Sequence, residues 1–158
     1  MIVWRRDVPR ALVTGGAAGV VAGAWSPWVA SGAVDRTSFE MAGLVERLGF
    51  ASSGAVGVAV RAWPLVPLCV VTATVLVWWG RGTTAAVLSA AGGAYAAVVS
   101  ASVWQASDVG LVRVLDGPAR TFAGSIVLLA GAVVTAALTR PTRSGVAARP
   151  STSPTGPS

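Results

Sequence analysis

The chain has 158 residues, of which 54% are apolar and 11% are charged, and its net charge is +6. Soluble domains carry about 25% charged residues, so a water-soluble fold would leave much of the apolar surface uncovered, and a membrane protein is predicted. All twelve basic residues are arginines, and they lie scattered at the ends of uncharged runs instead of gathering on one face, so nucleic-acid binding is not expected.

The first predicted membrane helix covers residues 11–30, an uncharged run that follows a basic flank at residues 1–10. Arginines in such a flank mark the cytoplasmic side under the positive-inside rule. Gly15, Gly19 and Gly23 recur every four residues, so they are predicted to share one helix face on which a second helix packs closely. A cleaved signal peptide is the alternative, but the run is longer than the usual signal core of about 7 to 15 residues.

Residues 31–63 are mixed in charge and are predicted to form the first external segment. Thr37 and Glu40 have the spacing of a capping box, which starts a helix at Ser38. An amphipathic helix is therefore predicted over residues 38–48, where it covers the end of the bundle or lies on the membrane surface. Its apolar face is formed by residues that recur at i, i+3, i+4 and i+7: Met41, Leu44, Val45 and Leu48.

The second span is predicted over residues 64–80, which is short for a hydrocarbon core of about 30 Å. Residues 49–60 are small and apolar, and two interpretations remain open for them: a loop, or an upward extension of this span past Arg61. Residues 80–82 form the whole connection to the third span. The second and third spans are therefore predicted to form a tight antiparallel hairpin.

The third span is predicted over residues 83–104. It places a small residue at every fourth position, at Ser89, Gly93 and Ala97, and this second smooth face is expected to meet the glycine face of the first span. Tyr95 falls near the middle of the span. Its hydroxyl is expected to bond a neighbouring backbone carbonyl or serine, in preference to a ligand.

Residues 105–120 are predicted to form a second external segment, residues 121–139 the fourth span, and residues 140–158 a disordered cytoplasmic tail rich in Pro, Ser, Thr and Gly. Four spans place both termini on one side. Seven of the twelve arginines fall in the segments on that side, which indicates the cytoplasm. The tryptophans all fall at span ends, Trp4, Trp78 and Trp79 at inner ends and Trp25, Trp28, Trp63 and Trp104 at outer ends.

Residues with catalytic or metal-binding chemistry are scarce. Cys69 is the single cysteine and histidine is absent, so no internal disulfide and no zinc or haem site is expected. No P-loop, GxSxG, HExxH or paired CxxC motif is present. Each external carboxylate has an arginine within a few residues, which favours solvated ion pairs over catalysis. We therefore predict no catalytic, metal or cofactor-binding residue and no cofactor.

A recognition surface is predicted at the outer end of the first span, where Trp25, Trp28, Arg36 and Phe39 are expected to converge. The segment WSPWVASGAVDRTSF, with the amphipathic GLVERLGF that follows it, resembles small four-helix integral membrane proteins of actinobacteria whose role is unassigned. The resemblance covers this segment and the number of helices. It implies the same membrane architecture and carries no catalytic residues.

The sequence thus predicts an all-α polytopic protein of the inner (plasma) membrane, with four transmembrane helices, a short external amphipathic helix and both termini cytoplasmic. The expected function is that of a non-enzymatic accessory or scaffold subunit of an envelope complex, which contacts the lipid bilayer and other membrane proteins or copies of itself. Two alternatives remain. One is a small transporter or channel subunit with a pore lined by Thr72, Thr74, Ser89 and Tyr95, and the other is a lipid-modifying membrane enzyme that uses loop carboxylates such as Asp35 and Asp108.

Overall fold

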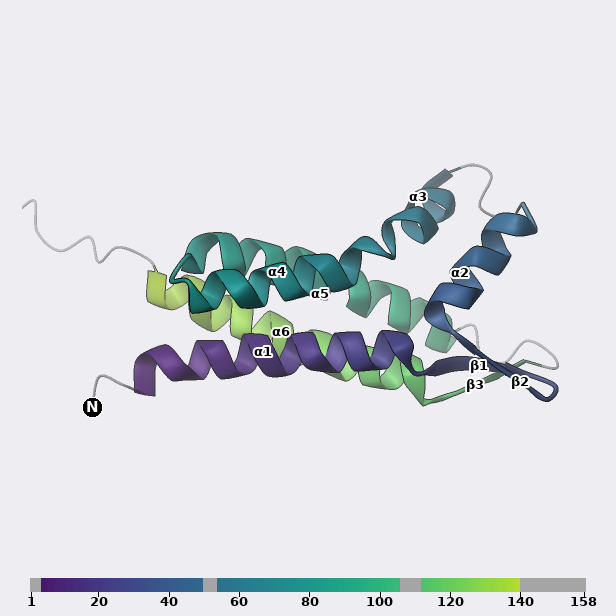
Figure 1. The fold of residues 1–158 in the computed structure, drawn as a ribbon, viewed down its shortest axis with the longest axis horizontal. Helices are drawn as coiled ribbons and strands as arrows, with labels where there is room; N and C mark the ends of the chain where they lie inside the picture. Colours follow the sequence, from purple (N-terminus) through teal and green to yellow (C-terminus); the bar gives the residue numbers. More distant parts are fainter. Residues whose placement is uncertain (1–3, 50–53, 106–111, 140–158) are drawn as a thin grey trace, which may run out of the picture.

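Four helices run along the length of the molecule, and three short strands with two shorter helices gather at one end (Figure 1). The structure, a computed structural model, describes residues 4–49, 54–105 and 112–139. The long helices are α1 (Trp4–Trp25), α4 (Leu65–Trp78), α5 (Gly82–Gln105) and α6 (Asp116–Thr139). The other elements are β1 (Pro27–Ser31), β2 (Val34–Thr37), α2 (Ser38–Arg47), α3 (Gly54–Ala62) and β3 (Val112–Val114).

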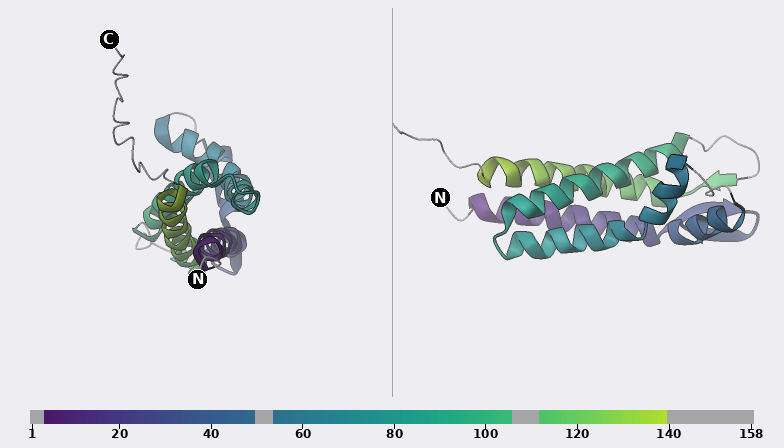
Figure 2. Two further views of the ribbon diagram at one scale, coloured as in Figure 1. Left: turned by 90° about the vertical axis from the view of Figure 1, so that its left-hand side faces the viewer. Right: turned by 90° about the horizontal axis from the view of Figure 1, so that it is seen from above.

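The four long helices form an antiparallel bundle. Helix α1 packs against α6 and α4, and α5 packs against the same two helices, so the order around the bundle is α1, α4, α5, α6 (Figure 2). We call the end that carries the strands, α2 and α3 the sheet end, and the opposite end, where α4 turns into α5, the hairpin end. The start of α1 and the end of α6 lie at the hairpin end (Figure 1).

Small side chains fill the interior of this bundle, and larger apolar side chains lie on its outside. Leu128 is the largest of the fully buried side chains, and most of the others are valine, threonine or serine. Helices α5 and α6 are long and apolar enough to cross a membrane, while α4 is apolar but shorter. The fold is therefore mostly helical as predicted, but two of the four expected spans meet both criteria among the described residues. Exposed apolar side chains on α4, α5 and α6 include Leu65, Leu68, Val71, Val87, Val98, Ile126 and Val133.

The glycine face of α1 packs on α6, and this corrects the expectation that it meets the third span. A Cβ added at Gly16 would lie 2.6 Å from the Leu128 Cα, and one added at Gly19 would lie 2.9 Å from the Gly124 Cα. Gly23 is equally close to α6, since an added Cβ would lie 2.5 Å from the backbone nitrogen of Thr121. Gly15 has no atom within 4 Å of an added Cβ, so the packed set is Gly16, Gly19 and Gly23.

The small-residue face of α5 also packs inside the bundle. A Cβ added at Gly93 would lie 3.2 Å from the Leu129 side chain of α6, and one added at Gly92 would lie 3.1 Å from that of Val70 on α4. Ser89 is fully buried, and among the described residues its Oγ has no hydrogen-bond partner. Ala97 is partly buried. Cys69, predicted to be buried, is partly buried.

The first helix ends earlier than predicted, at Trp25 instead of Ala30. Pro27 explains this end, because a proline disfavours helical backbone at the residue before it. The chain then enters β1, the central strand of a three-stranded antiparallel sheet in the order β2-β1-β3. Gly32 has a φ of +64° in the two-residue turn that joins β1 to β2. No strand was predicted in this region.

The segment between the sheet and the hairpin agrees with several predictions. Helix α2 begins at Ser38, and the capping box of Thr37 and Glu40 is present. Residues 54–60, by contrast, are neither a loop nor an extension of the second span: they belong to α3, a separate helix that a break at Trp63 and Pro64 divides from α4. The hairpin is tight, because α4 ends at Trp78 and α5 begins at Gly82, with Gly80 in the left-handed conformation at a φ of +78°.

The predicted tail, residues 140–158, and Asp108 lie outside the described residues.

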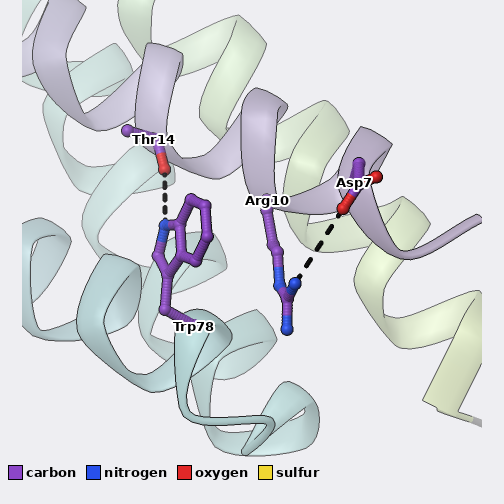
Figure 3. A network of polar contacts seen from close by, with 4 residues as sticks. All are labelled: Asp7, Arg10, Thr14 and Trp78. Atoms are coloured by element: carbon purple, nitrogen blue, oxygen red, sulfur yellow. Dashed lines mark hydrogen bonds and ion pairs between the residues drawn. The ribbon is translucent and has the colours of Figure 1, made fainter. Parts of the chain in front are cut away.

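A polar network ties α1 to α4 at the hairpin end (Figure 3). The guanidinium of Arg10 lies 5.1 Å from the ring centroid of Trp78, and Arg10 Nη1 is 3.9 Å from Asp7 Oδ1. Trp78 Nε1 donates a hydrogen bond of 3.2 Å to Thr14 Oγ1. A cation over the face of tryptophan is attracted by the ring quadrupole, so this contact helps to fix the α1–α4 pair beside the hairpin.

Candidate ligand pocket at the sheet end

An apolar pocket of about 360 Å³ lies at the sheet end between α2, α3 and α5. Its volume falls in the range of small-molecule sites, about 300–1,000 Å³. The capping box starts α2 where the sheet ends, and the 3.6-residue period then turns its apolar face toward the pocket. We call this cavity the sheet-end pocket. It is lined by Trp28, Val29, Ser38, Met41, Ala42, Val45, Ala59, Val60, Trp63, Tyr95, Val98, Val99, Ser102 and Val103.

Two buried tryptophans and a tyrosine form the aromatic wall of the pocket. The rings of Trp28 and Trp63 meet edge to face with centroids 5.2 Å apart, and Trp63 and Tyr95 are 6.2 Å apart. Trp28 and Trp63 are 3% and 4% exposed. Trp28 packs on Gly117 at the start of α6, where an added Cβ would lie 2.8 Å from its Nε1. The wall therefore holds the sheet, α3 and α5 together.

The polar atoms that line the pocket already have hydrogen-bond partners. Ser38 Oγ donates to the Ala24 carbonyl at 2.7 Å and accepts from Trp63 Nε1 at 3.0 Å. Tyr95 donates its hydroxyl proton to the carbonyl of Ala59, which agrees with the prediction of a backbone partner. The remaining donors are also paired, Trp28 Nε1 with the Gly23 carbonyl at 2.8 Å and Ser102 Oγ with the Val98 carbonyl at 2.8 Å. The pocket thus offers apolar contact and few free polar groups.

An ion pair connects the two helices that flank the pocket. Arg61 Nε of α3 lies 3.6 Å from Glu46 Oε1 of α2, and the two side chains are 65% and 57% exposed. Such exposed pairs contribute at most about 1 kcal/mol to stability. The pair joins α2 to α3 beside the pocket and does not form a buried acid or base.

A second hollow, of about 310 Å³, lies between β3 and the start of α6. Arg113, Asp116 and Arg120 contribute its charged side chains. Arg120 Nη2 is 4.0 Å from Asp116 Oδ2, and both side chains are strongly exposed. This hollow is a solvated surface, and Asp116 and Arg120 form an ordinary exposed ion pair at the start of α6.

The predicted recognition residues come together only in part. Trp25 and Phe39 pack with ring centroids 4.8 Å apart, and Trp25 remains 56% exposed. Trp28 is buried in the wall of the sheet-end pocket and is not a surface residue. Arg36 lies on β2, opposite Val29 of β1. The pocket itself was missed, although the predicted apolar face of residues 38–48 supplied part of its wall.

The side chains proposed for a pore do not share one cavity. Thr72 is exposed, and Thr74 donates its hydroxyl proton to the carbonyl of Val70 on its own helix. Ser89 is fully buried in the bundle. Of the four, Tyr95 alone lines the sheet-end pocket.

The described carboxylates are exposed, and most of them pair with arginine. The pairs are Asp7 with Arg10, Glu46 with Arg61, and Asp116 with Arg120. Glu40 instead accepts the backbone N–H of Thr37 at 2.8 Å, and this hydrogen bond lowers the pKa of its carboxyl below the ordinary value of 4.5. Within residues 4–49, 54–105 and 112–139, no group of three His, Cys, Asp or Glu side chains is placed to hold a metal ion.

Acid is expected to loosen the start of α2 through Glu40. Because the folded pKa of Glu40 is lowered, its stabilising effect is present above the unfolded pKa and is lost as the pH falls through the folded pKa. Hydrogen exchange of the α2 backbone amides is measured from about pH 6 down to about pH 3. The protection of these amides, relative to an unfolded chain at the same pH, should be weaker at the acidic end. The Glu40→Gln variant serves as the control and should lose this pH dependence; equal profiles for the two proteins would contradict the prediction.

Comparison with models of known protein families, with curated proteins and with solved structures found no match to this chain. The resemblance of residues 25–39 and 43–50 to small actinobacterial membrane proteins therefore stays an expectation.

Proposed function

We propose that this chain is an inner-membrane protein with four spans and both termini in the cytoplasm, and that it acts as a non-enzymatic accessory or scaffold subunit of an envelope complex. In this arrangement α1, α4, α5 and α6 cross the bilayer. The sheet end lies at the outer surface and the hairpin end at the cytoplasmic surface. The outer faces of the bundle contact lipid and partner proteins.

The observation that supports this proposal most strongly is the distribution of apolar side chains by size. Leu68 on α4 is 64% exposed, Val87 on α5 is 62% exposed and Val133 on α6 is 69% exposed. Water would disfavour so many exposed apolar side chains, and large exposed patches mark membrane or protein contacts. The interior is built from glycine and other small residues, which is the packing that membrane helices use because lipid gives them no hydrophobic reason to associate.

Charge and tryptophan support the orientation. Arg5, Arg6, Arg10 and Arg81 all belong to the hairpin end, which fits the cytoplasmic side under the positive-inside rule. Trp78 and Trp79 lie beside them at the same end and are 57% and 75% exposed. Exposed indole rings favour the headgroup level of a membrane.

The accessory role is supported by the kind of surface that the described residues present. Their carboxylates are solvated, and the sheet-end pocket is apolar with its polar atoms paired. Acid–base catalysis uses groups whose pKa is tuned by burial or by neighbouring charges. Exposed apolar side chains for packing are abundant on α4, α5 and α6. A subunit that binds by packing requires nothing more.

The topology is tested by the labelling of single cysteines in a Cys69→Ala background. Asp35→Cys at the sheet end should react with a membrane-impermeant maleimide in right-side-out membrane vesicles. Arg81→Cys at the hairpin end should react only in inside-out vesicles. Both positions are exposed in the native chain, so labelling of both from one side would contradict the four-span arrangement.

The accessory role is tested by photocrosslinking in native membranes. A photoreactive amino acid at Val133, on the exposed face of α6, is expected to yield adducts of higher mass than the monomer. The matched control is Leu128, on the buried face of the same helix, which should react only within the chain. Recovery of monomers alone from both positions would count against a partner.

A further inference from the structure

We propose that the sheet-end pocket holds one acyl chain of a membrane phospholipid, an inference that rests on the proposed placement of the bundle in the bilayer. The lipid enters sideways from the outer leaflet. Its chain lies between Met41 and Val45 of α2 and Val99 of α5, three side chains that line the pocket.

The chemistry of the walls selects a hydrocarbon. Five described side chains in the lining carry polar atoms, and each already has a hydrogen-bond partner within the protein: Ser38, Trp63, Tyr95, Trp28 and Ser102. A ligand with many donors or acceptors would lose its bonds to water and gain few in return, which is unfavourable. A hydrocarbon chain has no such groups, and it gains the full benefit of leaving water.

The location of the pocket makes lipid the accessible source of that hydrocarbon. Val98 lines the pocket and is also 65% exposed on the outer face of α5. The pocket wall is therefore continuous with the surface that the proposed function places against lipid. Trp104, at the end of α5, and Trp25, at the end of α1, are both exposed at the sheet end, where the pocket lies. Exposed tryptophans favour the headgroup region. An acyl chain beside Val98 reaches the pocket without crossing water.

The arrangement of α2 and α3 places the entrance for the acyl chain beside Val98 of α5. Helix α3 precedes the break at Trp63 and Pro64, and its axis leans away from that of α4 (Figure 1). Glu46 and Arg61 join α2 to α3 on the exposed side of the pair. The cover formed by α2 and α3 thus leaves α5 as the wall of the pocket that meets lipid.

A photoreactive lipid tests the proposal directly. The purified full-length chain is placed in nanodiscs of phosphatidylcholine that carries a diazirine in one acyl chain, and adducts are located by peptide mass spectrometry after illumination. Adducts are expected at Met41 and Val99, which are only partly exposed. Ala42→Phe fills the pocket from α2 and should lower labelling at these two positions by at least about tenfold.

The matched control is Ala90→Phe, which adds the same ring to the exposed face of α5 and should leave pocket labelling unchanged. Val45→Phe fills the pocket from a second position, so the result does not depend on the folding of one variant. Pocket labelling that survives both filling variants, or that is absent while Val133 is labelled, would overturn the proposal. A photoreactive amino acid in place of Ala42 gives a further test in native membranes. If it captures another protein and no lipid, the proposal is overturned in favour of a partner helix in the pocket. Absence of label at Val133 as well would instead refute the membrane placement.

Discussion

Gly16→Ala is expected to destabilise the protein by about 2 to 3 kcal/mol, whereas Gly15→Ala should change stability by less than about 0.5 kcal/mol. The two glycines are adjacent in α1, but a Cβ at Gly16 would lie 2.6 Å from the Leu128 Cα, and a Cβ at Gly15 would meet no atom within 4 Å. The first contact is with backbone, which cannot rotate away. Helices α1 and α6 must therefore separate and lose van der Waals contact along their length.

Reversible unfolding in mixed detergent micelles, followed by far-ultraviolet circular dichroism, measures this difference. The Gly15 variant is a close control, because it makes the same change in helix propensity one position away. Alanine favours the helix over glycine, so a loss for Gly15→Ala as large as that for Gly16→Ala would show that the α1–α6 contact does not set the difference between the two variants. Gly124→Ala on α6 should reproduce the effect of Gly16→Ala, since its Cβ would lie 2.5 Å from the backbone nitrogen of Val20.

The glycine pair also shows what the sequence could predict about α1. The spacing of four identified a glycine-rich face, but an interval of four residues advances slightly more than one helical turn and drifts around the helix. Gly16, Gly19 and Gly23, at intervals of three and four, stay closer to one line. Which of two overlapping faces turns inward depends on the neighbouring helix, and the sequence did not show that this neighbour is α6.

Local signals predicted local structure well. The capping box of Thr37 and Glu40 fixed the start of α2, and the short link around Gly80 fixed the hairpin, because each depends on residues a few positions apart. Pro27 was a local signal too. The absence of charge in residues 11–30 favours one long span, whereas proline removes a backbone donor and disfavours helix at the preceding residue.

The sheet and the pocket depend on contacts between distant segments. Strand β3 has three residues and pairs with β1 about eighty positions earlier, and so short a strand carries no clear period of its own. The pocket draws its walls from β1, α2, α3 and α5. The sequence supplied the apolar face of α2 but not the surface that it covers, because that surface exists only after the bundle has formed.

Trp63→Ala is expected to be the most damaging single change at the sheet end, with a loss of about 3 to 5 kcal/mol. Trp63 is 4% exposed and packs between Trp28 and Tyr95, with centroid distances of 5.2 and 6.2 Å. Its removal leaves a cavity in the aromatic wall and breaks the hydrogen bond of 3.0 Å to Ser38 Oγ. That bond is one of the ties between the start of α2 and the break that precedes α4.

Near-ultraviolet circular dichroism and unfolding in mixed micelles test this, and limited proteolysis adds a local readout. Cleavage should increase in α2 and α3 before it increases in α5 or α6, because the wall holds the cover on the bundle. Trp79→Ala is the matched control, since Trp79 is 75% exposed and is solvated by detergent whether the chain is folded or not. Equal losses for the two variants would mean that the wall does not hold α2 and α3. Trp63→Phe should recover most of the loss, because it restores the ring packing while leaving Ser38 its bond to the Ala24 carbonyl.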